Sequence, residues 1–270
     1  QQFLNFTAIM KKDQSRIIRE QATRSATREH SVPLYLTSSF IFESAEQGRA
    51  IFAEEEEGMV YSRYANPNTT EFIKRVSTLE GAETGLAFAS GMAAVFASFA
   101  AFIESGDHIV SSRAIFGSTH QLLTQVFPKW GVTHTYVNTA DIDAWENAIQ
   151  ANTKILFLES PSNPGLELYD LEKLGVLKKK YPHIIFAIDN CFATPYLQKP
   201  LKYGFDLSIH DLYVYLAPIS TLLRHHLSKR FSCLECMTIL DVCSGSLTSE
   251  HLSLHFLFAD HCSALVSVVR

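Results

Sequence analysis

The sequence predicts an α/β protein of three layers, in which helices cover both faces of a mostly parallel sheet. Two observations lead to this fold class. Between residues 80 and 210, short apolar runs of strand length alternate with segments of helical periodicity, which is the pattern of strand–helix–strand units. The chain has 270 residues, 47% of them hydrophobic, so it can bury one large core.

Six apolar runs are the candidate strands. In chain order they are GLAFA (85–89), HIVSS (108–112), THTYV (133–137), KILFLE (154–159), IIFAID (184–189) and DLSIH (206–210). Four segments between them have the spacing of helices, namely 92–103, 120–130, 143–150 and 170–181. Asp143 and Asp170 stand near the expected starts of the last two, where an aspartate can cap the helix.

Charge and hydropathy argue against some classes of function. The net charge of −5 gives no reason to expect a nucleic-acid partner. No apolar run approaches the length needed to cross a bilayer, and the first residues lack the pattern of a signal peptide. We therefore expect a cytoplasmic protein that has no membrane partner. The acidic run at residues 54–57 is interpreted as a solvated face.

Polar and small residues follow the predicted strands, at the edge of the sheet where α/β proteins bind ligands. Gly91 and Met92 open a helix, so their backbone N–H groups could hold an anion. Phe116 offers an aromatic face, Asn163 a hydrogen bond, and Asp189 a carboxylate. Singly, each is also a common structural residue, such as a cap or a turn former. Together they suit a flat, phosphorylated, protonated heteroaromatic ring, and pyridoxal phosphate is such a ligand.

At these residues the chain resembles the Cys/Met-metabolism family of pyridoxal-phosphate enzymes. The resemblance runs from about residue 20 to residue 210 and implies the aspartate-aminotransferase type of fold (fold type I). The chain is most similar to the O-succinylhomoserine sulfhydrylases, because Phe116 stands where related lyases usually carry a tyrosine. The matching segments are VYSRYANPNTTEF (60–72), ASGMAA (89–94), FGSTH (116–120), ESPSNP (159–164) and DNCFATPYLQKPLKYGFDLSIH (189–210).

The resemblance implies a role for each residue at the strand ends. The backbone of Gly91 and Met92 would hold the cofactor's phosphate. Phe116 would stack on the ring, and Asn163 would form a hydrogen bond with the ring hydroxyl. Asp189 would pair with the pyridine nitrogen and keep it protonated.

The same resemblance implies an assembly of several subunits. Residues 1–65 are expected to form an extended N-terminal arm that packs on another subunit, ahead of a cofactor-binding α/β domain over residues 66–210. Tyr61 and Arg63 would reach the phosphate of a neighbouring subunit, so the expected assembly is a homotetramer built from dimers. The cluster YSRY by itself indicates only that an arginine lies among tyrosines.

The lysine that binds the cofactor covalently in this family has no counterpart in the sequence. The family continues after the strand DLSIH with the motif HSATK, which ends in that lysine. Here the register gives HDLYV, so Asp211 stands at the serine position, Tyr213 at the threonine position and Val214 at the lysine position. We therefore predict no catalytic residue, and we expect the carboxylate of Asp211 to repel a phosphate.

Residues 211–270 are predicted to form a divergent, partly helical tail, with helix-like periodicity over 247–269, and the family's C-terminal domain is expected to be absent. Three explanations stay open: a truncated or damaged enzyme, a variant that binds cofactor non-covalently or serves as an interaction protein, and a shifted loop that brings Lys229 to the ring. Cys233 and Cys236 make a zinc site conceivable, but a lone C-x-x-C is a weak signal, and no metal site is predicted.

The activity implied for the intact enzyme is a γ-replacement on a small-molecule substrate. Sulfide would displace succinate from O-succinylhomoserine and give homocysteine, a reaction of methionine biosynthesis. Cystathionine γ-synthase or γ-lyase chemistry at the same site is the alternative. From another class of function, the alternative is a catalytically incompetent protein that binds pyridoxal phosphate or a partner.

Overall fold

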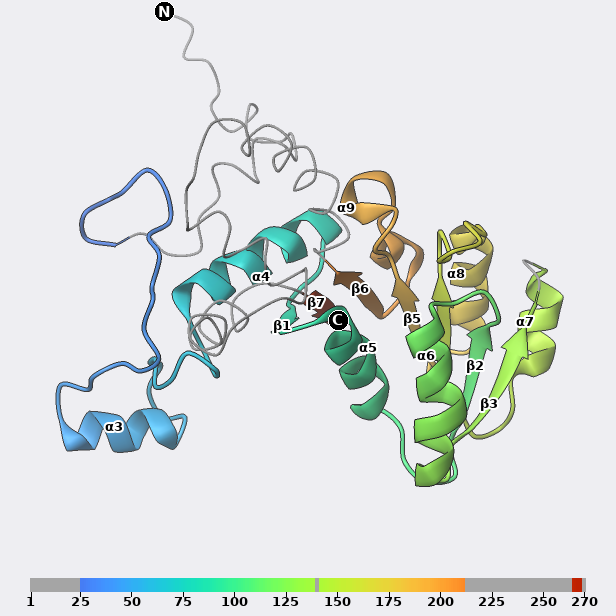
Figure 1. The fold of residues 1–270 in the computed structure, drawn as a ribbon, viewed down its shortest axis with the longest axis horizontal. Coiled ribbons are helices and arrows are strands. Elements are labelled where there is room, and N and C mark those ends of the chain that lie inside the picture. Colours follow the sequence, from blue (N-terminus) through green and yellow to red (C-terminus); the bar gives the residue numbers. More distant parts are fainter. Residues whose placement is uncertain (1–24, 139–140, 212–263, 269–270) are drawn as a thin grey trace, which may run out of the picture. The chain divides into compact units, whose positions relative to one another are not determined.

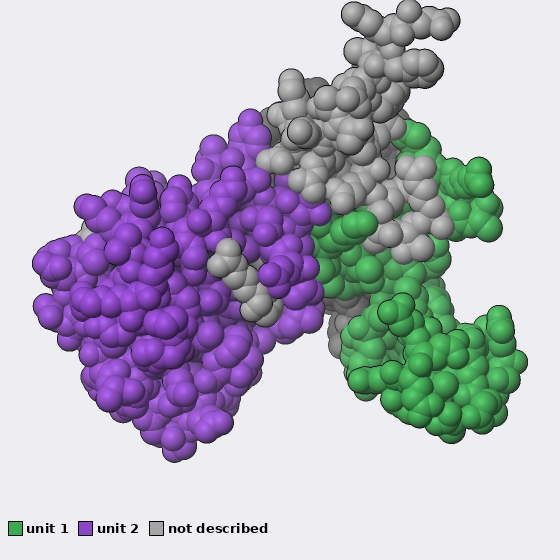
Figure 2. All heavy atoms as spheres, turned by 180° about the vertical axis from the view of Figure 1, so that it is seen from behind, with its two compact units in different colours: residues 1–75, 233–262 green, residues 76–232, 263–270 purple. Residues whose placement is uncertain are grey.

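The computed structural model describes residues 25–138, 141–211 and 264–268. The chain divides into two compact units. Residues 1–75 and 233–262 belong to the first unit, and residues 76–232 and 263–270 belong to the second. Figure 2 shows the two units in different colours.

The described part of the first unit, residues 25–75, is only partly an extended arm. Helix α3 (Ala45–Phe52) interrupts it, beginning after Ser44, whose side chain accepts a hydrogen bond from the backbone N–H of Gln47. A serine cap of this kind satisfies an N–H group that the first helical turn leaves without a partner. Helix α4 (Pro67–Glu80) begins in the first unit and ends in the second. The prediction of an extended arm therefore missed a helix.

A sheet of seven strands forms the centre of the second unit, within the described residues. The strand order is β1-β7-β6-β5-β4-β2-β3, and the pairs from β6 to β3 are all parallel. The six predicted strands and the mostly parallel sheet are confirmed, each strand within one residue of its expected bounds. The strands are β1 (Leu86–Phe88), β2 (His108–Ser112), β3 (Thr133–Val137), β4 (Thr153–Glu159), β5 (Ile185–Asp189), β6 (Leu207–Asp211) and β7 (Ala264–Val268).

Strand β7 was not predicted. It lies between β1 and β6 and pairs antiparallel with both, with Leu86 opposite Val266 and Leu207 opposite Val268. The helix-like periodicity that we read over residues 247–269 is therefore wrong for residues 264–268. A short apolar run fits a buried strand as well as a helix, so periodicity alone could not decide between them.

Helices and helical turns connect the strands. The predicted helix over 120–130 begins earlier, at Gly117, and is first α-helical, then π-helical and last 3₁₀. Pro128 cannot donate a backbone hydrogen bond in the 3₁₀ turn. Gly131, with a φ of 78°, ends the helix in the left-handed region. The elements are α5 (Gly91–Ala100), α6 (Gly117–Gln121), the π-helical η1 (Leu122–Val126), the 3₁₀ turn η2 (Phe127–Trp130), α7 (Ile142–Ala148), α8 (Leu171–Lys180), α9 (Thr194–Leu197) and the 3₁₀ turn η3 (Pro200–Tyr203).

The sheet of the second unit has a core on each face, which gives the three predicted layers (Figure 1). Strand β4 illustrates the alternation, since Ile155 and Phe157 belong to one core and Leu156 and Leu158 to the other. Side chains of α5 and of residues 122–127 pack in the first core, and side chains of α7 and α8 pack in the second. The strand ends are thereby fixed on both faces.

Three further predictions concern the acidic run, membrane spans and the C-terminal cysteines. The acidic run at residues 54–57 is exposed, as predicted. Among the described residues, no helix has the length and hydropathy of a membrane span. The cysteine pair Cys233 and Cys236, together with Val214 and Lys229, lies outside the described residues.

Candidate functional site

The carboxyl ends of β4, β5 and β6 lie side by side, because these three strands are parallel neighbours. Glu159, the last residue of β4, connects two loops at this edge. Its Oε2 accepts a hydrogen bond of 2.7 Å from the backbone N–H of Phe116, and its Oε1 accepts one of 2.7 Å from the backbone N–H of Asn163. The structure thus brings two predicted site residues to one carboxylate that the sequence analysis did not single out.

Asp189 ends β5 and is the register partner of Glu159. Its Oδ1 accepts a hydrogen bond of 3.0 Å from the backbone N–H of Cys191. Burial raises the pKa of the Asp189 carboxyl group, against the effect of this hydrogen bond and of His210. Burial and the charge of Asp189 raise the pKa of Glu159 from 4.5 to about 8. Two adjacent carboxyl groups that are shielded from water resist being ionised together, so the pair tends to keep a proton or to bind a cation.

A buried polar cluster supports the end of β5 from behind. The Oε1 of Glu80 lies 3.0 Å from Nδ2 of Asn190, 2.7 Å from Oγ of Ser208 and 2.5 Å from Nε2 of His210. All four side chains are fully buried. Because the C-terminal residue of α4 is tied in this way to β5 and β6, the residue after Asp189 has one fixed position. The cluster has no exposed atom for a ligand, so we assign it a structural role.

Phe116 and Asn163 lie in the loops that follow β2 and β4. Phe116 is 41% exposed, so part of its ring surface is open for stacking. Asn163 lines a cavity of about 360 Å³ together with residues of both loops. Its role toward the ring hydroxyl stays a prediction, as does the stacking role of Phe116.

Gly91 opens α5, and the carboxylate of Asp211 lies directly in front of it. A β-carbon built on Gly91 would be 2.4 Å from Oδ2 of Asp211. Ser90 caps the same helix, since its side chain accepts a hydrogen bond of 3.2 Å from the backbone N–H of Ala93. The backbone N–H of Asp211 donates to Sγ of Cys191 at 2.9 Å, and this contact joins the ends of β5 and β6. An acidic side chain thus occupies the helix N-terminus where an anion is expected.

Tyr61 and Arg63 belong to the first unit. The guanidinium of Arg63 lies 5.0 Å from the centre of the Tyr61 ring, which fits a cation–π contact. An antiparallel bridge joins Tyr61 to Ser39. The predicted role of both residues at a neighbouring subunit's phosphate stays a prediction.

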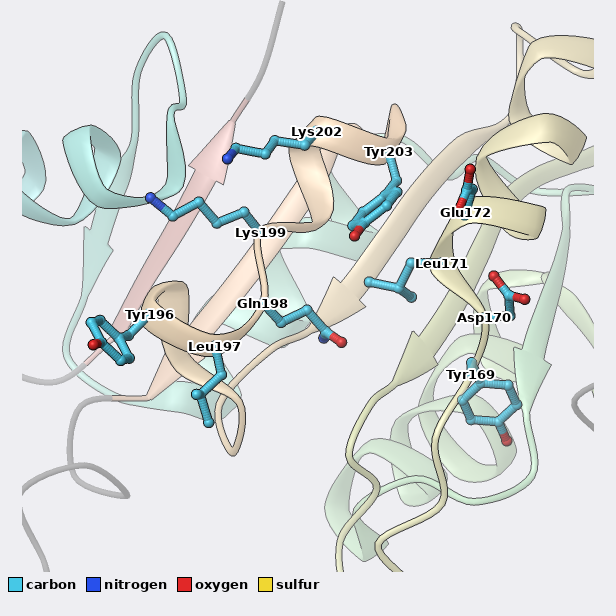
Figure 3. A pocket seen from close by; sticks show the side chains of 10 residues that line it. All are labelled: Tyr169, Asp170, Leu171, Glu172, Tyr196, Leu197, Gln198, Lys199, Lys202 and Tyr203. Atoms are coloured by element: carbon cyan, nitrogen blue, oxygen red, sulfur yellow. The ribbon is translucent and has the colours of Figure 1, made fainter. Parts of the chain in front are cut away.

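A larger cavity, of about 430 Å³, lies between α8 and the segment from α9 to η3. Figure 3 shows Leu171, Gln198 and Tyr203 pointing into this space, while Lys199 and Lys202 extend away from α8. None of the predicted cofactor-binding residues lines it. Size alone therefore does not identify the functional site in this unit. Among the described residues, no group of three or more metal-ligating side chains occurs.

The side chains that are predicted to bind the ring would suit pyridoxal phosphate, but the residues at the predicted phosphate end do not suit a phosphate in this arrangement. A flat cationic ring suits an open aromatic face at Phe116 and a carboxyl group at Asp189 whose pKa is raised by burial. At the phosphate end, the space in front of Gly91 holds the carboxylate of Asp211. A phosphate would have to displace this side chain or accept its repulsion.

Comparisons with known proteins identify the family of the chain. The model of the family "Cys/Met metabolism PLP-dependent enzyme" matches residues 14–227. An L-methionine gamma-lyase of Fusobacterium nucleatum is 41% identical over 186 residues, which are 69% of this chain and 47% of the relative. An O-succinylhomoserine sulfhydrylase of Pseudomonas aeruginosa is 43% identical over 199 residues, which are 74% of this chain and 49% of the relative.

Solved structures resemble the fold as well. A Campylobacter jejuni protein that carries N'-pyridoxyl-lysine-5'-monophosphate aligns with a TM-score of 0.70 and 34% identity, covering 75% of this chain and 50% of that protein. The cystathionine gamma-lyase of Lactobacillus plantarum, complexed with L-serine, aligns with a TM-score of 0.72 and 29% identity, covering 96% of this chain and 55% of the other. The chain spans about half the length of the relatives it matches.

The fold is the one of fold type I pyridoxal-phosphate enzymes, and the family match covers most of the chain, including every residue that the sequence analysis assigned to the cofactor. The chain belongs to the Cys/Met metabolism family of PLP-dependent enzymes.

Proposed function

We propose that the protein derives from an O-succinylhomoserine sulfhydrylase, which makes homocysteine and succinate from O-succinylhomoserine and sulfide. Two observations support this activity over others in the family. The loop after β2 carries Phe116 in the segment FGSTH, which resembles the sulfhydrylases, and a relative of that name is 43% identical over 199 residues. The arrangement of Phe116, Asn163 and Asp189 around Glu159 supports the ring-binding part of the proposal.

Bound pyridoxal phosphate supplies an electron sink for a carbanion next to an amino group. The residues of this chain would bind and orient it. Phe116 would cover one ring face, and Asp189 would hold the pyridine nitrogen in its protonated form, which the buried position beside Glu159 favours. Asn163 would fix the ring hydroxyl.

We propose further that the chain as written has no turnover. Val214 stands where the family places its lysine, so the chain offers no amine there to bind the cofactor or to move a proton. Asp211 adds a carboxylate at the phosphate end. Val214→Lys alone is therefore expected to leave homocysteine formation at background, since Asp211 and Tyr213 remain.

Lyase chemistry is the alternative activity, because an L-methionine gamma-lyase is 41% identical over 186 residues. Binding of stable ligand conjugates discriminates the two without turnover. N-pyridoxyl-O-succinylhomoserine and N-pyridoxyl-methionine are titrated into the chain by calorimetry; neither carries a phosphate, so Asp211 affects both little. We expect the succinyl conjugate to bind about tenfold more tightly. Equal binding, or tighter binding of the methionine conjugate, would favour lyase chemistry.

The proposed assembly is a homotetramer built from dimers, with Tyr61 and Arg63 at a neighbour's phosphate. Sedimentation of the wild-type chain and of an Arg63→Ala variant, with and without pyridoxal phosphate, tests this assembly. We expect the cofactor to shift the wild-type chain toward dimers or tetramers and to leave the variant unchanged. A wild-type chain that stays monomeric at high concentration would contradict the proposal.

A further inference from the structure

Glu159 uses both of its carboxylate oxygens to hold the backbone of two separate loops. Oε2 accepts from Phe116 N at 2.7 Å, and Oε1 accepts from Asn163 N at 2.7 Å. Glu159 is 5% exposed, and among the described residues it makes no ion pair. A buried carboxyl group that accepts hydrogen bonds of 2.7 Å from two backbone N–H groups is a geometrically specific clamp.

Other contacts hold each loop separately: Ile115 is buried in the first core, and the backbone N–H of Ser162 donates to the carbonyl of Glu167 at 3.0 Å. Glu159 adds a hydrogen-bonded link between the two loops. Phe116 is 41% exposed, so burial of this residue anchors the loop weakly. Helix α6, which begins one residue later, has no side-chain cap at Phe116. On the β4 side, Glu159 is the register partner of Asp189, so the clamp and the carboxyl group proposed to meet the ring stand on neighbouring strands.

We propose that Glu159 is a positioning residue for the ring of the cofactor. It sets the distance and angle between Phe116, Asn163 and Asp189, so that the three groups meet a flat ring as one preformed unit. This inference rests on the proposed function, since it assumes that the ring binds at these residues. Preformed geometry lowers the entropy lost when the ring binds, which is the physical advantage of such a clamp.

The first test needs no ligand. In the ¹H–¹⁵N spectrum and in amide hydrogen exchange, the N–H groups of Phe116 and Asn163 are compared among the wild-type chain, Glu159→Gln and Glu159→Ala. A glutamine has one acceptor oxygen, so we expect one of the two amides to lose protection in Glu159→Gln and both to lose about tenfold or more in Glu159→Ala. Amides of the β4 core, such as that of Phe157, should keep their protection.

Glu167→Gln is the matched control, because Glu167 lies in the loop after β4 and, among the described residues, its carboxylate makes only a long hydrogen bond of 3.4 Å, from the Tyr169 hydroxyl. It should leave both amides unchanged. Full protection of both amides in Glu159→Ala would overturn the inference. So would a uniform loss that includes the β4 amides, since this outcome would mean a purely structural role.

The second test measures the ring. Pyridoxal, which has no phosphate, is titrated by fluorescence into the same variants. We expect about tenfold weaker binding in Glu159→Ala, an intermediate loss in Glu159→Gln, and no change in Glu167→Gln. Unchanged affinity in Glu159→Ala would contradict the inference. If the wild-type chain itself binds no pyridoxal, the proposed function fails, and the amide measurement still decides whether Glu159 couples the two loops.

Discussion

Replacing Asp211 by serine should restore affinity for a phosphate and for nothing else. The carboxylate of Asp211 lies in front of Gly91, with Oδ2 2.4 Å from the position of a β-carbon on that glycine. Two unit charges about 4 Å apart repel by ~4 kcal/mol at an effective dielectric constant of about 20. Asp211 is partly exposed, so water reduces this repulsion, and we take ~1–3 kcal/mol as the gain.

A gain of this size corresponds to roughly 5- to 150-fold tighter binding, since about 1.4 kcal/mol is tenfold. The assay is a fluorescence titration of the wild-type chain and Asp211→Ser with pyridoxal phosphate and, as the matched ligand, pyridoxal. The backbone N–H that donates to Cys191 is retained in the variant. We expect a gain for pyridoxal phosphate alone. Equal affinities before and after the substitution, or an equal gain for both ligands, would refute the reasoning.

Three further predictions concern stability in urea. Glu159 has a pKa raised from 4.5 to about 8, so the folded state holds its proton more tightly and the free energy of unfolding should fall as the pH rises between these values. Glu159→Gln should flatten this slope; an unchanged slope would contradict the assignment. Glu80→Ala should cost about 3–5 kcal/mol, because it removes a fully buried carboxylate that binds three polar side chains; a loss below 1 kcal/mol would contradict a structural role. Gly175→Ala should destabilise clearly, since its β-carbon would meet the backbone oxygen of Tyr203 at 2.1 Å, whereas Gly117→Ala, with no atom within 4 Å, is the neutral control.

Strands β4 and β5, at the centre of the parallel part of the sheet, were predictable because each is a nearly continuous apolar run. Residues 155–158, for example, place side chains in both cores, so these positions have no polar face. β7 was not predictable in the same way. Its five residues do not continue the alternation of strands and helices. Their antiparallel pairing with β1 and β6 depends on partners that are far away in the sequence.

The sequence predicted the residues that would contact the cofactor, but it did not indicate Glu159, which holds two of them in position. Glu159 stands in the motif ESPSNP, yet only Asn163 in that motif was singled out. Its partner Phe116 is 43 residues away, and no local pattern indicates that contact. For Asp211 the sequence predicted repulsion of a phosphate, while its position in front of Gly91 required the structure.

The central claim is that this chain holds no cofactor covalently at the family's site. The most direct test is the intact mass of the chain after incubation with equimolar pyridoxal phosphate and reduction with borohydride. Peptide mapping then locates any adduct, and the Asp189→Ala variant is treated in the same way as the control. We predict no lysine-linked pyridoxyl adduct that depends on Asp189. A stoichiometric adduct on one lysine, for instance Lys229, that disappears in Asp189→Ala would contradict the account.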